Sequence, residues 1–222
     1  MLIYELLRKM RIFSSLTNEE LHDLRKNIFV KEYLKGDIIQ REQSYAKAIP
    51  IVISGVTKII LVDRKDSKEV FLYYISEGST SVTTISQGLF KESLSLRIEA
   101  ETNCEIGYIP LEYFNLLLCK HPDIFQHLLE IYFNIFLDLI NSMSNHVFNN
   151  IEEKIIFLLH YKSKVLKTNV IETTHEQIAR ELNSSREVIT RALQDLMNDG
   201  KIEMEKKKIK LLDTFFNETA TH

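Results

Sequence analysis

Two helix-start signals, which lie ten residues apart, limit the fold of this sequence more than any other feature. Thr174 with Gln177 and Ser184 with Glu187 each have the spacing of a capping box, in which two side chains satisfy backbone N–H groups at a helix start. Only Leu182-Asn183 separates the apolar residues of the first predicted helix from the second helix. The segment therefore predicts two short helices joined by a tight turn, which is a helix-turn-helix.

The second of these helices has an apolar side and a polar side. Ile189, Ala192, Leu193, Leu196 and Met197 recur on one side at helical spacing, and Glu187, Arg191, Gln194 and Asn198 fall on the other. An arginine can bond both acceptors on the guanine edge, and a glutamate can accept from the cytosine amine. Hydroxyls at Thr174 and Ser185, near the predicted helix starts, are placed for phosphate contacts. We expect the helix to read double-stranded DNA, although a merely solvated charged face is the alternative.

A hairpin is predicted directly after this helix. Two short runs, at 201–205 and 209–212, follow the turn at Asp199-Gly200 and flank Lys206-Lys207-Lys208. A hairpin with a basic tip suits the wing of a winged helix-turn-helix. The lysine run by itself is also compatible with a simple solvated turn.

The first half of the chain has the pattern of an antiparallel β structure. Short β-branched and aromatic runs lie at 49–53, 57–62, 70–75 and 106–109, and polar or glycine turns separate them. Thr17 and Glu20 have capping-box spacing and predict a short helix before these strands. This spacing predicts a sandwich or a jelly-roll-like β-roll.

A long helix is predicted after Pro122, because apolar residues recur every three to four positions from Phe125 to Val147. Its apolar surface is wider than one buried stripe, so that one side can cover the β-roll and another can meet a second copy of the chain. Asn149-Asn150 interrupts the pattern and can cap the next helix. We therefore expect an α+β homodimer with a β-roll at 1–121, a dimerisation helix at 122–148 and a winged helix-turn-helix at 149–222.

Charge and composition narrow the class of protein. The net charge is −3, but residues 150–213 hold 12 Lys and Arg against 11 Asp and Glu, which permits a DNA partner. No apolar run approaches the roughly 20 residues that cross a bilayer, and the N-terminus lacks a signal-peptide core, so we expect a cytoplasmic protein without a membrane partner. An enzyme is not expected, because no nucleophile and base set, phosphate-binding glycine loop or metal-ligand spacing occurs.

These segments together resemble the cAMP receptor protein/FNR superfamily (Crp/Fnr family) of bacterial transcription regulators. The resemblance covers nearly the whole chain and is most specific at 185–191, which reads Ser-Arg-Glu-Val-Ile-Thr-Arg against the family's Ser-Arg-Glu-x-Val-x-Arg. It implies a cyclic-nucleotide-binding-like β-roll and RNA polymerase as a further partner. It also implies an operator that is an inverted repeat with half-sites about one helical turn apart, ~34 Å. The implied base-reading residues are Arg186, Glu187 and Arg191, and the implied phosphate contacts are Thr174, His175 and Ser185.

The predicted sensor half departs from the members of the family that bind cAMP. Those members hold the ribose with a glutamate and the cyclic phosphate with an arginine. Alignment places Thr83 or Thr84 at the position of the glutamate and Leu94 at the position of the arginine. Two hydroxyl residues of those members reach the adenine, and Leu139 and Ile140 align near their positions. We therefore expect no cAMP binding and no other defined cofactor. The hydroxyl residues Thr80, Ser81, Thr83 and Thr84 either line a pocket for an unknown effector or form an exposed loop.

Two other functions stay open at this point. The first is a regulator of the same family that senses a gas or redox state through haem, although the histidines show no ligand spacing and no metal site is expected. The second is a β-roll ligand-binding module whose C-terminal part contacts only proteins. Of the two cysteines, Cys104 lies in a predicted strand and is expected to be buried, and Cys119 has more room for reactivity.

Overall fold

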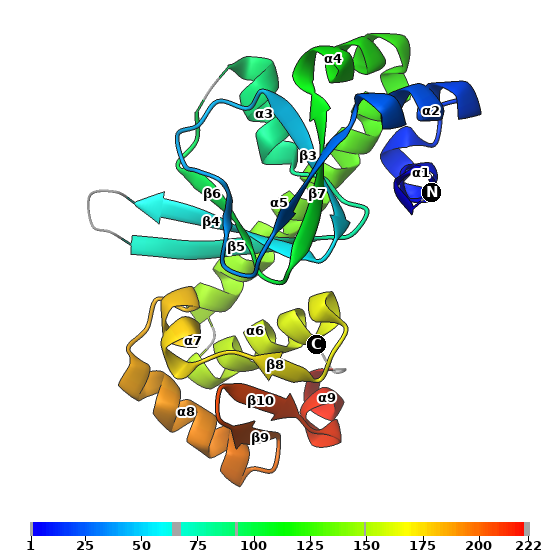
Figure 1. The fold of residues 1–222 in the computed structure, drawn as a ribbon. Coiled ribbons are helices and arrows are strands. Elements are labelled where there is room, and N and C mark those ends of the chain that lie inside the picture. The colour runs from blue at the N-terminus through cyan, green and yellow to red at the C-terminus, as the bar shows by residue number, and fades with distance from the viewer. Residues whose placement is uncertain (1, 64–67, 92, 149, 220–222) are drawn as a thin grey trace. The chain divides into compact units, whose positions relative to one another are not determined.

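The structure is a computed structural model that describes residues 2–63, 68–91, 93–148 and 150–219. The chain divides into two compact units (Figure 1). The first comprises residues 1–68 and 72–138, and the second comprises residues 69–71 and 139–222. The two units are described separately below.

Two antiparallel sheets form the β-roll of the first unit (Figure 1). One sheet has the order β1 (Phe29–Tyr33), β7 (Cys104–Pro110) and β3 (Ala48–Ser54). The other has the order β2 (Ile38–Gln40), β6 (Leu96–Ala100), β4 (Val56–Asp63) and β5 (Lys68–Ser76). Inward-facing residues such as Ile59, Ile98 and Ile106 fill the space between the sheets and are almost fully buried. The four predicted β runs are therefore strands, and the predicted β-roll is confirmed.

Helices cover the β-roll and continue its core. They are α1 (Leu2–Lys9), a short 3-10 helix η1 (Arg11–Phe13), α2 (Asn18–Asn27), α3 (Val82–Phe90), α4 (Leu111–Lys120) and α5 (Pro122–Phe148). The capping box predicted at Thr17 and Glu20 starts α2. Leu24 of α2, Phe114 of α4 and Ile124 of α5 meet in one buried cluster. The sequence correctly predicted α5 as one long helix.

Only one side of α5 is buried in its unit. Ile124 and Leu128 pack into the core, whereas Phe125, Leu129 and Phe133 are more than half exposed. Of the residues aligned with the adenine contacts of the family, Ile140 is partly exposed, and the side chain of Leu139 lies outside the described part. The described half of α5 therefore carries an apolar surface that its own unit does not cover.

The hydroxyl-rich segment is a helix start and not an exposed loop, which corrects one of the two readings of the sequence. Ser81 caps α3, and its Oγ accepts from the backbone N–H of Thr84 at 3.2 Å. Val82 and Ile85 of this helix are buried in the same cluster as α2 and α4. Burial of these apolar side chains holds the segment inside the unit.

The second unit is a three-stranded sheet packed with helices. Its elements are α6 (Ile151–Leu166), β8 (Val170–Glu172), α7 (His175–Glu181), α8 (Arg186–Asn198), β9 (Ile202–Glu205), β10 (Lys208–Leu211) and α9 (Asp213–Thr219). Asn150 caps α6, as predicted, and forms a capping box with Glu153. The predicted hairpin is β9 and β10, and β8, which the sequence did not predict, pairs with β10 on its other edge. Within the described ranges, no helix has the length and apolar character to cross a membrane.

Candidate nucleic-acid interface

Helix α7 begins at the first of the two predicted caps. Thr174 Oγ1 accepts from the backbone N–H of Gln177 at 3.2 Å, and Gln177 Oε1 accepts from the backbone N–H of Thr174 at 2.8 Å. The capping box is therefore complete. Ile178 and Ala179 bury the inner side of this short helix against the core of the second unit. The hydroxyl hydrogen of Thr174 stays available for a phosphate oxygen, because its oxygen only accepts in the cap.

Helix α8 begins one residue later than the sequence predicted. Ser185, not Ser184, is the cap, and its Oγ accepts from the backbone N–H of Val188 at 3.3 Å. Asn183 adopts the left-handed conformation with φ +48° and ends the turn after α7, and the N–H of Ser184 donates to the carbonyl of Ala179 at 2.9 Å. Because the backbone of Ser184 belongs to this turn, α8 begins after the next residue, Ser185. The predicted pairing of Ser184 with Glu187 is wrong.

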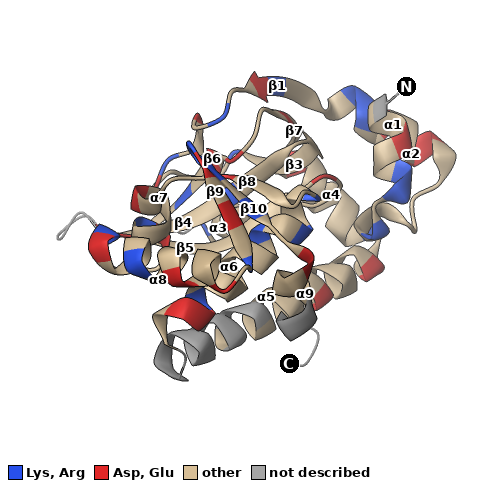
Figure 2. Cartoon of the chain, turned by 90° about the horizontal axis from the view of Figure 1, so that it is seen from below, with Lys and Arg blue, Asp and Glu red and all other residues tan. Residues whose placement is uncertain are grey.

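The outward side of α8 carries the three predicted base-reading residues. Arg186, Glu187 and Arg191 are all exposed, and both positive and negative residues mark this helix in Figure 2. Among the described residues, neither guanidinium is engaged in a hydrogen bond. The backbone N–H of Glu187 and the Ser185 hydroxyl hold the pKa of the Glu187 carboxyl below its ordinary value, so that this group stays an ionised acceptor.

One exposed apolar residue on α8 was not singled out from the sequence. Val188 is 45% exposed, although it lies one residue before Ile189, which is fully buried. A valine on the outward side of such a helix can contact the methyl group of thymine. The signal was its place in the helical pattern, since it lies three residues before the outward position Arg191 and therefore next to it on the helix surface.

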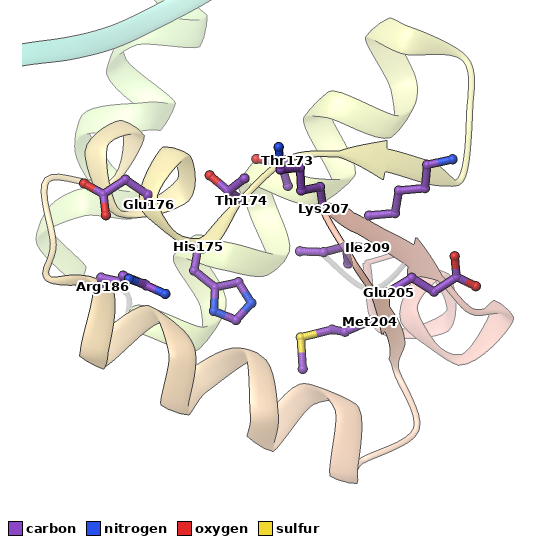
Figure 3. Close-up of a pocket in the computed structure, with 10 residues that line it drawn as sticks. Thr173, Thr174, His175, Glu176, Arg186, Met204, Glu205, Lys207 and Ile209 are labelled. Atoms are coloured by element: carbon purple, nitrogen blue, oxygen red, sulfur yellow. The ribbon is translucent and has the colours of Figure 1, made fainter.

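A groove of about 250 Å³ runs between the start of α7, the start of α8 and the hairpin of β9 and β10. Its lining is shown in Figure 3 and consists of Thr173, Thr174, His175, Glu176, Arg186, Met204, Glu205, Lys207, Lys208 and Ile209. The groove therefore unites two of the three predicted phosphate contacts, Thr174 and His175, with the predicted base reader Arg186. The third predicted contact, Ser185, caps α8 directly before Arg186.

The tip of the hairpin adds positive charge to this groove. Lys208 pairs with Glu172 at 3.9 Å, and Lys210 pairs with Glu203 at 2.9 Å. Lys206 and Lys207 have no ion pair with another described residue. Lys207 adopts φ +62° in the turn, and its carbonyl accepts from the backbone N–H of Thr173 at 3.1 Å, which anchors the hairpin beside α7.

The hydroxyls of the candidate effector pocket bond to their own unit. Thr80 Oγ1 donates to the carbonyl of Pro50 at 2.7 Å, and the Thr83 and Ser81 hydroxyls bond each other at 2.9 Å. Thr84 Oγ1 lies 2.9 Å from Oε1 of Gln40. The hollow beside Ser81 measures only about 10 Å³ and is otherwise lined mainly by apolar residues, which leaves room for about one water molecule.

The two cysteines differ in exposure. Cys104 is buried as expected, its Sγ donates to the carbonyl of Val56 at 3.1 Å, and burial raises the pKa of the thiol. Cys119 is exposed. No group of three or more His, Cys, Asp or Glu suited to a metal ion occurs in the described ranges.

Comparison with known proteins places the second unit in a defined domain class. Residues 155–214 match the Crp-like helix-turn-helix domain. No curated protein matches the sequence significantly.

Solved structures resemble the whole chain. A putative transcriptional regulator of the Crp/Fnr family from Eubacterium rectale has a TM-score of 0.77 at 22% identity, with 94% of this chain and 96% of that chain covered. The c-di-GMP responsive global regulator CLP from Xanthomonas campestris has a TM-score of 0.75 at 21% identity, with 88% and 99% covered. Residues 155–214 are therefore a Crp-like helix-turn-helix domain, within a chain that has the fold of the Crp/Fnr transcription regulators.

Proposed function

We propose that this chain is a sequence-specific, DNA-binding transcription regulator. The observation that carries the proposal is the outward side of α8, the second helix of the helix-turn-helix, where Arg186, Glu187 and Arg191 are exposed directly after the cap. Arginine guanidinium groups that no other described residue engages in a hydrogen bond can bond the two acceptors of guanine in the major groove. Glu187 is ionised and can accept from a cytosine amine.

Phosphate contacts hold α8 in register on the DNA. The Thr174 hydroxyl, the His175 ring and Lys207 line the groove at the helix starts, and Ser185 caps α8 beside it. Such contacts carry no sequence information but fix the position of a recognition helix. The groove therefore binds one strand of the DNA backbone while α8 lies in the major groove.

The DNA-binding form is a homodimer that forms along α5. Phe125, Leu129, Phe133 and Phe136 are all more than half exposed and recur at intervals of three and four residues. A row of this spacing buries well against the same row of a second helix. Two copies related by a twofold axis read an inverted repeat whose half-sites are about one helical turn, ~34 Å, apart. RNA polymerase is the further partner that we propose for the DNA-bound dimer.

Regulation by this chain does not depend on cAMP. The positions that align with the nucleotide clamp of the family, at Thr83 or Thr84 and at Leu94, carry no charge that could hold a cyclic phosphate. The hydroxyls of the segment are bonded within the unit, and the adjacent hollow has room for about one water molecule. Both observations support a dimer that binds DNA without cAMP.

The function is tested by selecting binding sites from random duplex DNA with the purified chain and no added ligand. Arg186→Ala and Arg191→Ala are each expected to relax sequence preference at a defined base pair, with a loss of about 1–3 kcal/mol for the preferred site. Lys164→Ala is the matched control, because it removes one positive charge from an exposed position on α6 of the same unit. Sequence profiles that stay unchanged in both arginine variants contradict the proposal.

A further inference from the structure

His175 is the first residue of α7, and its ring is held by a residue of α8. Nδ1 of His175 lies 2.9 Å from Oγ1 of Thr190. The same Oγ1 lies 2.8 Å from the carbonyl oxygen of Arg186. A carbonyl oxygen only accepts, so the single hydroxyl hydrogen of Thr190 is donated to Arg186. The Thr190 oxygen is then an acceptor toward His175, and Nδ1 of the ring must carry a hydrogen.

This tautomer determines what the ring offers to the groove. With the hydrogen on Nδ1, the Nε2 atom of the neutral ring has a lone pair and no hydrogen. Within the described chain, Nε2 has no hydrogen-bond partner, and the ring lies in the groove with Arg186 and Met204 (Figure 3). A lone pair repels a phosphate oxygen, whereas protonated Nε2 donates a charge-assisted hydrogen bond to it. A phosphate in the groove therefore favours the doubly protonated ring.

Charged residues of α7, α8 and the β9–β10 hairpin line the groove around the His175 ring. They are Glu176 on α7, Arg186 on α8, Glu205 on β9, Lys207 in the turn, and Lys208 on β10, which is paired with Glu172 of the neighbouring strand β8. Groups of both signs thus line the same groove. A phosphate that arrives at Nε2 adds a full negative charge at hydrogen-bond distance, which favours the protonated ring.

We propose that DNA binding takes up one proton from solvent at Nε2 of His175 in each protomer. The inference rests on the proposed function, because it needs a DNA phosphate in the groove. Histidine side chains ordinarily exchange this proton near pH ~6.5. Since the DNA-bound state holds more protons than the free state, DNA affinity increases as the pH falls through this range. His175 then makes DNA affinity depend on pH, in addition to contacting a phosphate.

Fluorescence anisotropy with a labelled, mixed-sequence duplex of about 30 base pairs tests the proposal, because the contact does not depend on base sequence. At constant ionic strength, the wild-type chain is expected to bind about tenfold more weakly at pH ~8 than at pH ~6. His175→Gln keeps an amide donor that does not titrate, and His175→Arg keeps a permanent charge. Both should bind with nearly the same affinity at the two pH values, and His175→Arg should bind more tightly than His175→Gln.

Two further variants separate this mechanism from other titrating groups. Thr190→Val removes the acceptor that fixes the tautomer, so that a neutral ring can carry its hydrogen on Nε2, and the dependence of affinity on pH should weaken. His127→Gln is the matched control, because it removes a histidine of α5 in the other unit, and it should keep the wild-type dependence. Calorimetric titration of wild-type chain with the same duplex, in buffers of different ionisation enthalpy, counts the protons directly and should show uptake.

The outcomes distinguish the two proposals. Wild-type binding that shows no proton uptake, or a His175→Gln profile parallel to that of the wild type, overturns the role of His175 and leaves DNA binding intact. A chain that binds no duplex at any pH in this range overturns the proposed function itself.

Discussion

Loss of one charge from the buried ion pair beneath α7 should cost far more stability than loss of a charge from a surface pair. Lys162 of α6 is only 2% exposed, and its Nζ donates to Oε1 of Glu181 on α7 at 2.9 Å. Lys162→Met keeps the length of the aliphatic chain but removes the ammonium from Glu181, whose side chain is only 13% exposed. Removal of one partner from a buried pair typically costs about 3–5 kcal/mol. Because Glu181 keeps some solvent contact, we expect a loss near the lower limit, about 3 kcal/mol.

The free energy of unfolding of the full chain, measured by urea titration with far-UV circular dichroism, provides the assay. Lys210→Met is the matched control, since Lys210 and Glu203 also meet at 2.9 Å but are 53% and 56% exposed, and its loss should stay within about 1 kcal/mol. The double variant Lys162→Met/Glu181→Leu should recover most of the loss, because an apolar pair can replace a buried ion pair at little cost. The reasoning is refuted if Lys162→Met costs no more than Lys210→Met, or if the double variant is less stable than Lys162→Met alone.

Two remaining predictions concern the first unit. Hydrogen bonds from Lys120, and then from the backbone of Thr17, lower the pKa of Glu20 from 4.5 to about 2, so its contribution to stability is present above pH 4.5 and is lost as the pH falls toward 2. Glu20→Gln should therefore flatten the dependence of the unfolding free energy on pH in this window, and wild-type and variant curves that run parallel there contradict this assignment. Isothermal titration of the chain with cAMP should give no binding heat, and a Kd of about 1 μM or tighter would contradict cAMP independence.

The sequence predicted the helix-turn-helix well because its signals are local. Thr174 and Gln177 satisfy each other within one helical turn, and the buried side of α8 follows from the spacing of its apolar residues. The start of α8 was displaced by one residue, because Ser184 and Ser185 are both good caps. The conformation of the turn selects Ser185 as the cap, since the N–H of Ser184 is bonded to the carbonyl of Ala179 and Ser184 is therefore part of the turn. That bond joins residues on two sides of the turn and has no signature in the sequence.

Helix α3 was not predicted from the sequence, because its serine and threonine content is typical of a loop and obscured the helical spacing of its apolar residues. Serine and threonine are poor helix formers and are frequent in loops, and five of them lie between Ser79 and Thr84. The apolar residues Val82, Ile85 and Leu89 nevertheless recur at helical spacing, and Ser81 lies one residue before the first of them. The structure uses this pattern, since Val82 and Ile85 are buried in the core of the unit. Here the spacing of the apolar residues was a better guide to secondary structure than the content of hydroxyl residues.

Some residues of the proposed interface also stabilise the fold and others do not, and variants of the two groups must be interpreted differently. Arg186 and Arg191 have exposed side chains that no described residue bonds, so we expect their replacement to change DNA binding with little effect on stability. Thr174 and Ser185 also cap α7 and α8, and loss of such a cap costs about 1 kcal/mol of stability. A weaker complex after their truncation would therefore combine loss of the proposed phosphate contact with a frayed helix. The arginines, and not the caps, are the residues from which base reading by α8 can be measured.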